Sequence, residues 1–160
     1  MTADLTGLPN RRHVMRLANQ YLTSTSKNKT NLCLAILDVD FFKAVNDEYG
    51  HDVGDLVLQQ VAKEASSVLR ATDILGRIGG EEFLVILNQS ELKQAEFILE
   101  RMREKVEKAS FAGSLKLSVS ISCGVVQFTK ETNLLELTKK ADEALYKAKA
   151  TGRNKVVLAA

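Results

Sequence analysis

The stretch from Leu32 to Val39 is almost entirely apolar, and it constrains the fold more than any other part of the chain. An apolar run of this length is typical of a β-strand that is buried on both faces. It ends in Asp38-Val39-Asp40, so a buried strand carries two acids at its carboxyl end. Buried carboxylates are costly unless they are paired or used, and this end of the strand is therefore a candidate functional site.

The segment Arg77 to Phe83 reads Arg-Ile-Gly-Gly-Glu-Glu-Phe and lies between two apolar runs. Gly79-Gly80 in this setting predicts a tight hairpin, because glycine adopts positive φ without a Cβ clash. Glu81 and Glu82 then lie at or just past the turn. Adjacent acids repel each other unless a cation or a basic group is close. A solvated acidic turn is the alternative interpretation.

Periodicity predicts the other elements. Asn10 can cap a first helix, and Gly152 is a typical stop for the last one. The expected helices are a first one after Asn10, a short turn within 41–50, a long helix from 51, and helices at 90–108 and 133–150. The expected strands are 32–39, the hairpin strands at 74–75 and 83–87, an alternating strand at 115–123, and 156–158.

This order of elements resembles a split βαβ, ferredoxin-like sheet with helices on one side. In such a sheet the strand at 32–39 and the hairpin are central neighbours. Asp38 would therefore meet Glu81 and Glu82 at one end of the sheet.

Composition sets broader limits. The 160 residues form one domain with room for a full core, and 45% hydrophobic with 26% charged residues is ordinary for a globular protein. A net charge of +2 gives no reason to expect a nucleic acid or a membrane surface as partner. Cys33 and Cys123 lie in apolar runs and are interpreted as buried hydrophobic residues. Neither a membrane span nor a signal peptide is visible, so we expect a cytoplasmic domain that is part of a larger protein.

Three or four acids that converge at the strand end, among Asp38, Asp40, Glu81 and Glu82, would form an oxygen-only site. Oxygen ligands suit Mg²⁺ or Mn²⁺, which commonly work beside substrate phosphates, whereas a zinc site would need more than His51 nearby. Lys43, Lys149 and Arg153 are available to hold phosphates. Metal together with basic side chains indicates phosphoryl or nucleotidyl transfer, and the absence of a Walker A sequence argues against a P-loop enzyme.

Several blocks of the chain, in order, resemble the GGDEF domain, the catalytic domain of bacterial diguanylate cyclases. Gly79-Gly80-Glu81-Glu82-Phe83 is similar to the family signature in its GGEEF form. The other similar blocks are Leu5 to Arg12, Asp38 to Lys43 with Asn46-Asp47, Gly50 to Asp55, and Ala148 to Asn154. Residues 1–160 then form a single GGDEF domain, the catalytic part of a larger protein. Ala3 is a departure, because the family usually has an acid at that position.

The resemblance implies an α+β nucleotidyl-cyclase palm, with a mostly antiparallel central sheet of about five strands surrounded by helices. It also implies GTP as substrate, cyclic di-GMP as product, and two domains that each present one GTP to the other. Asp38, Glu81 and the Val39 carbonyl would hold about two Mg²⁺ or Mn²⁺ ions. Glu82 would ligate metal or assist deprotonation of the 3′-hydroxyl, and Asp40 would be a ligand or a supporting residue.

The substrate-binding positions implied by the resemblance are Phe41, Phe42, Lys43, Asn46, Asp55, Gly79, Gly80, Lys149 and Arg153. Asn46 and Asp55 would read the guanine edge. The lysines and Arg153 would hold phosphates together with backbone N–H groups at 41–42, while the glycines allow the substrate to approach closely. His51, Asp47 and Asp52 are interpreted as helix-start or solvated residues.

Arg70-Ala71-Thr72-Asp73 looks like the R-x-x-D inhibitory site at which the family binds its own product as an intercalated dimer. Arginine suits this task because its planar guanidinium group pairs with phosphate or guanine and stacks on a base. Arg101 could be a second contact. The alternative is an ordinary Arg–Asp pair at a helix end.

Three functions fit these residues: an active diguanylate cyclase, a catalytically silent receptor for cyclic di-GMP or GTP, and a cyclase with relaxed base choice. The undamaged signature argues against the receptor, and Asp55 argues against relaxed base choice. The resemblance further implies a second copy of the domain and an attached regulatory domain as partners.

Overall fold

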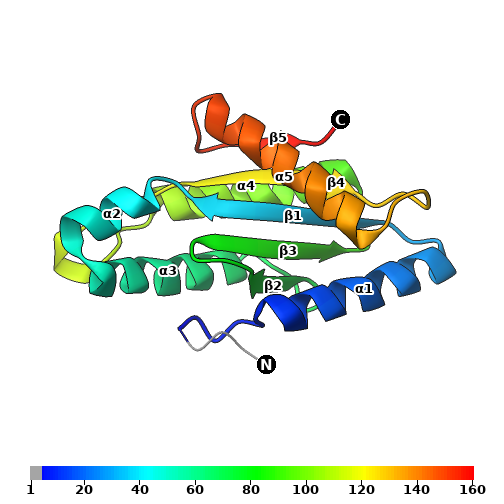
Figure 1. Cartoon of the computed structure of the whole chain (residues 1–160), viewed down its shortest axis with the longest axis horizontal. Coiled ribbons are helices and arrows are strands. Elements are labelled where there is room, and N and C mark those ends of the chain that lie inside the picture. Colours follow the sequence, from blue (N-terminus) through cyan, green and yellow to red (C-terminus); the bar gives the residue numbers. More distant parts are fainter. Residues whose placement is uncertain (1–4) are drawn as a thin grey trace.

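The computed structural model describes residues 5–160 and shows an α+β fold built on one five-stranded sheet (Figure 1). The helices are α1 (Arg11–Asn28), α2 (Phe42–Tyr49), α3 (His51–Ser66), α4 (Leu92–Lys108), the short 3₁₀ helix Gly113–Leu115, and α5 (Leu134–Ala150). The strands are β1 (Leu32–Val39), β2 (Ile74–Arg77), β3 (Glu82–Asn88), β4 (Ile121–Gln127) and β5 (Val156–Leu158).

The sheet has the order β2-β3-β1-β4-β5, and only the pair β4 and β5 is parallel. The hairpin strand β3 is therefore a direct neighbour of the central strand β1, as the element order predicts. The expected mostly antiparallel sheet is confirmed. Ala3, the departure from the family pattern, lies outside the described residues.

Helices cover both faces of the sheet, so the expectation of helices on one side only is wrong. Side chains of β1 alternate between two apolar layers: Ala35 and Leu37 pack with residues of α3 and α4, whereas Leu34 and Ile36 pack with residues of α1 and α5. In Figure 1, α5 crosses in front of β4 and α4 lies behind the sheet. Because β1 is buried along its whole length, both of its faces need such cover.

The alternating segment 115–123 forms a strand only at its end, because β4 begins at Ile121. Ala112 and Lys116 have φ values of 57° and 49°, and these left-handed residues turn the chain before it can pair with the sheet. Phe111 is fully buried and exchanges two backbone hydrogen bonds with Leu117, at 2.8 and 2.9 Å. The prediction of a continuous strand is therefore wrong.

The hairpin between β2 and β3 is present, but its glycines do not play the predicted part. Neither Gly79 nor Gly80 adopts positive φ. The loop is instead closed by the Glu82 carbonyl, which accepts from the N–H groups of Ile78 and Gly79 at 3.0 and 3.3 Å. The turn is therefore wider than a two-residue hairpin and does not need left-handed glycine.

Other local predictions hold. Asn10 caps α1 by accepting from the His13 N–H at 2.9 Å, and Gly152 follows α5 with a φ of 116°. Cys33 and Cys123 are buried and unpaired. Over residues 5–160, none of the helices is long and apolar enough to cross a membrane.

Candidate active site

Acidic side chains of neighbouring strands lie side by side at the end of β1. Asp38 is opposite Glu82 of β3 on one side and opposite Ser122 of β4 on the other. Glu81 comes directly before β3, and its carbonyl accepts from the Val39 N–H at 3.2 Å. The structure thus places Asp38, Glu81 and Glu82 at the same end of the sheet, as the sequence predicts.

The electrostatics of this sheet end favour a cation. The pKa of Asp38 is raised to about 6: burial is the main cause, Lys149 opposes it, and the charges of Glu81 and Glu82 add a smaller upward effect. Burial also raises the pKa of Glu82, with a further contribution from Asp142. The Lys149 ammonium pairs directly with the Asp38 carboxylate. Acids that hold their protons this tightly would gain from a bound positive charge.

A cleft of about 290 Å³ opens beside Asp38. Its lining combines the acids with most of the predicted phosphate-binding residues: Asp38, Val39, Asp40, Phe41, Phe42, Lys43, Ala44, Glu81, Lys149 and Arg153. Phe41 precedes α2 with a φ of 56° and makes no side-chain cap for that helix. The first N–H groups of α2 therefore remain available to an anion in the cleft.

The residues expected to read guanine lie outside this lining. Asn46 belongs to α2 and Asp55 to α3, two helices that pack against each other. Asn46 Oδ1 is buried, and no hydrogen-bond partner for it exists among residues 5–160. A Cβ atom on Gly54 would come within 1.8 Å of this oxygen, so Gly54 provides the space that the Asn46 side chain occupies.

Comparison with known proteins identifies the family. A family model described as "Diguanylate cyclase, GGDEF domain" matches residues 2–155. The chain belongs to the GGDEF domain family. The match covers the acids, the hairpin and the basic cleft described above.

This GGDEF domain is 40% identical over 139 residues to "Diguanylate cyclase A" from Treponema denticola, which covers 86% of this chain and 38% of that protein. It resembles the crystal structure of the diguanylate cyclase SiaD in complex with its activator SiaC from Pseudomonas aeruginosa. That match has a TM-score of 0.95 and 42% identity over 99% of this chain and 61% of the other. The GGDEF domain of DgcB from Caulobacter crescentus, in complex with c-di-GMP, matches with a TM-score of 0.94 and 31% identity. The match covers 99% and 95% of the two chains.

Two arginines that sequence reasoning did not assign hold the signature loop of the GGDEF domain. The Arg77 guanidinium donates to the carbonyls of Gly79 and Gly80, at 3.1 Å and 2.8 Å for its shortest contact to each. The Arg11 guanidinium donates to the Ile78 carbonyl at 3.2 Å. Arg77 begins the signature segment and Arg11 lies in the amino-terminal family block. Their place in these segments was the signal in the sequence that could have indicated a functional role.

Glu82 faces a different cleft from Glu81. It lines a space of about 520 Å³ over α1 and α5, together with Arg11, Ile78 and Asp142 among others. This placement follows from strand alternation, because Glu82 shares its face with Leu84 and Ile86. Its role in this GGDEF domain stays a prediction.

The predicted inhibitory residues are only partly together. Arg70 forms a bidentate pair with Asp73, at 3.0 and 2.8 Å, and also donates to the Asn88 carbonyl and to Ser90 Oγ. Asp73 is fully buried, whereas 47% of the Arg70 side chain is exposed. Arg101 is exposed on α4, and within the described part of the chain no hydrogen bond or ion pair joins it to the other two.

The donors at the end of β1 fit a hard divalent cation. Asp38 and Glu81 supply carboxylates. Val39, whose carbonyl could supply a third oxygen, directly follows Asp38 in the chain and pairs with Glu81 across the sheet. Among residues 5–160, the return bond from the Glu81 N–H to this carbonyl is not made, so the oxygen is available. Residues 5–160 contain no side-chain cluster of three or more His, Cys, Asp or Glu that could hold a metal by itself. A bound ion would therefore depend on the backbone oxygen as well.

The raised pKa of Asp38 would make metal binding at this carboxylate pH-dependent. Because the pKa is raised from 3.8 to about 6, the folded metal-free protein binds this proton more tightly than the unfolded chain does. The resulting stabilisation is present below pH 4 and is lost as the pH rises through about 6. Mg²⁺ should compensate for that loss only where Asp38 is ionised.

We therefore expect Mg²⁺, at a concentration on the order of 10 mM, to raise the unfolding temperature at pH 8. At pH 5 it should have little effect. Thermal unfolding across this range, with and without Mg²⁺, measures the difference. The control is Asp38→Asn, which should show no Mg²⁺ effect at either pH. An equal Mg²⁺ effect at pH 5 and pH 8 in the parent protein would contradict this assignment.

Proposed function

We propose that this domain is a diguanylate cyclase, which joins two GTP molecules into cyclic di-GMP and releases two pyrophosphates. Membership of the GGDEF family and relatives named diguanylate cyclase support the proposal. The observation that carries it is the row of acids at the end of β1, directly beside a cleft lined by basic residues. The chain spans 38% of the length of the Treponema relative, so the activity of any whole protein is part of this proposal.

Asp38, Glu81 and the Val39 carbonyl would hold Mg²⁺ or Mn²⁺, about two ions per site. Such a metal lowers the pKa of the attacking 3′-hydroxyl and neutralises the departing pyrophosphate. Lys149 would bind phosphate, because a metal at Asp38 replaces its ammonium as the neutralising charge. Glu82, which lies opposite Asp38, would ligate a metal or assist removal of the 3′-proton.

The remaining residues of the site would orient GTP. Lys43 and Arg153 line the cleft and would hold phosphates, helped by the N–H groups at the start of α2. Asp55 would accept from the ring N–H and amino group of guanine, and Asn46 would bind the same edge. Gly80 has open space around its Cα, which allows a substrate to approach.

A second copy of the domain is required, because each 3′-hydroxyl attacks the α-phosphate of the GTP held by the other copy. We propose that a regulatory segment of a longer protein brings the two copies together. GTP is a cytoplasmic metabolite, so the domain would act in the cytoplasm.

The test is GTP turnover by the domain fused to a constitutive dimer, with Mg²⁺ present and products identified by mass spectrometry. Cyclic di-GMP is the expected product, and the rate per domain should exceed that of the unfused domain. Tight binding of cyclic di-GMP without GTP turnover by the fused dimer would instead indicate a silent receptor. Turnover of ATP equal to that of GTP would contradict the role of Asp55.

Product inhibition through Arg70 and Asp73 is a separate part of the proposal. Asp73 fixes the Arg70 guanidinium, while nearly half of the Arg70 side chain remains exposed and could bind a phosphate or stack on a base. Arg101 on α4 would be a second contact. The site would bind the product as an intercalated dimer.

Replacing Arg70 with alanine should raise the cyclic di-GMP concentration for half inhibition by about tenfold or more, because a charged bidentate contact is lost. The uninhibited rate should stay within about twofold, since Arg70 is not a residue of the cleft. Inhibition curves on the fused dimer provide the measurement, with Arg16→Ala, an exposed residue of α1, as control. Unchanged inhibition of the Arg70 variant would place the inhibitory site elsewhere.

A further inference from the structure

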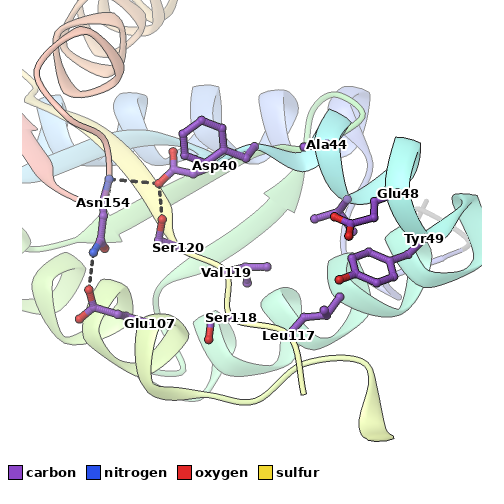
Figure 2. Close-up of a pocket in the computed structure, with 12 residues that line it drawn as sticks. Asp40, Ala44, Glu48, Tyr49, Glu107, Leu117, Ser118, Val119, Ser120 and Asn154 are labelled. Atoms are coloured by element: carbon purple, nitrogen blue, oxygen red, sulfur yellow. Dashed lines mark hydrogen bonds between the residues drawn. The ribbon is translucent and has the colours of Figure 1, made fainter. Parts of the chain in front are cut away.

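Asp40 follows β1 and is 5% exposed, yet its carboxylate is fully engaged by neutral donors. Ser120 Oγ donates to it at 2.6 Å, Ser122 Oγ at 2.7 Å, and the Asn154 backbone N–H at 3.1 Å. Figure 2 shows Asp40 turned toward Ser120 and Asn154. Both carboxylate oxygens accept hydrogen bonds, and these bonds orient Asp40 toward β4 and the turn after α5.

The turn after α5 is the part of the chain that Asp40 holds. Gly152, Arg153 and Asn154 have φ values of 116°, 63° and 48°, and two of these left-handed residues are not glycine. Such a conformation persists only where the surroundings enforce it. Asn154 is also held from α4, because Arg103 donates to its Oδ1 at 3.0 Å and its amide donates to Glu107 (Figure 2).

This turn positions the basic side of the cleft. Arg153 precedes the clamped Asn154, and its guanidinium lies 4.6 Å from the centre of the Phe41 ring. Lys149, one turn earlier on α5, pairs with Asp38. A shift of the turn would therefore move Arg153 relative to the acids at the end of β1.

We infer that Asp40 is a positioning residue, which clamps the turn at Asn154 and thereby sets the place of Arg153 against the phosphates of GTP. Asp38 differs from it in its contacts: within residues 5–160 the Asp38 carboxylate has a single side-chain partner, the ammonium of Lys149. Asp38 can exchange that partner for a metal, whereas Asp40 is fixed by three donors. The inference rests on the proposed function for its GTP step but not for the clamp itself.

The first test compares Asp40→Asn with Asp38→Asn. In Asp40→Asn, Mn²⁺ affinity measured by electron paramagnetic resonance without nucleotide should stay within about twofold, because no ligand is lost. In Asp38→Asn it should fall by about tenfold or more, because a charged ligand is lost. The backbone N–H of Asn154 should exchange its hydrogen faster in Asp40→Asn, since one of its two acceptors, the Asp40 carboxylate, is weakened while Ser122 Oγ remains. If Asp40→Asn does not fold, Ser122→Ala removes the bond that Ser122 Oγ donates to Asp40 and the one it accepts from the Asn154 N–H, and the same two measurements apply.

The second test asks whether Asp40 acts through Arg153. Asp40→Asn should weaken binding of a non-hydrolysable GTP analogue by about tenfold, but by less than about twofold when Arg153 is already alanine. Additive losses in the double variant, or loss of Mn²⁺ in Asp40→Asn, would overturn the inference. Failure of the parent domain to bind the analogue would contradict the proposed function instead. The Asn154 exchange rate would still decide whether the clamp exists.

Discussion

Glu81→Gln is expected to lower cyclic di-GMP synthesis by the dimerised domain by about a hundredfold to a thousandfold. Glutamine has nearly the same shape and removes only the negative charge that would face the metal. The backbone carbonyl of residue 81 still accepts from the Val39 N–H, so the hairpin should keep its place beside β1. The loss should therefore reflect charge at the site and not a displaced loop.

Initial rates of product formation at saturating Mg²⁺ measure this effect. Glu131→Gln is the matched control, because Glu131 is exposed in the loop after β4, at the opposite end of the sheet. The control should retain the parent rate, and both variants should unfold at the parent temperature. A Glu81→Gln rate within about threefold of the parent would remove Glu81 from the metal site.

Gly124→Ala should destabilise the fold by about 3 kcal/mol or more, because the contact partner is backbone and cannot move aside. A Cβ on Gly124 would lie 2.2 Å from the Ala141 carbonyl oxygen and 2.3 Å from the Leu145 nitrogen. Helix α5 therefore packs directly on the backbone of β4. Since α5 ends at the turn that carries Arg153, activity should fall as well.

Equilibrium unfolding in urea measures the change in free energy. Gly80→Ala is the control, because no heavy atom lies within 4 Å of its added Cβ and its φ is not positive. This control should change stability by less than about 1 kcal/mol, the usual range for such a site. A Gly124→Ala protein as stable as the parent would show that α5 does not pack this closely on β4.

The main features of the site could be predicted because they depend on short-range patterns. The apolar run of β1 indicated a central strand, and the hairpin glycines indicated its neighbour. These two inferences are enough to place Asp38 next to Glu81. The acidic and basic groups of the cleft then followed from the family blocks.

The wrong predictions, and the role of Asp40 that the sequence left open, concern features that no local pattern indicates. The left-handed residues Ala112 and Lys116 interrupt an alternating segment, and nothing in their side chains predicts that conformation. The role of Asp40 depends on donors far along the chain, among them Ser122 and Asn154. Sequence spacing could not show whether Asp40 faces a metal or these donors.

The most direct test of the metal site is a crystal structure of the domain with Mn²⁺ and a non-hydrolysable GTP analogue. Anomalous scattering locates the ions without assumptions about their ligands. We expect an ion between the carboxylates of Asp38 and Glu81 and within reach of the Val39 carbonyl, with Asp40 still bonded to Ser120. An ion held by Asp40, or a bound analogue with no ion beside Asp38, would contradict the account.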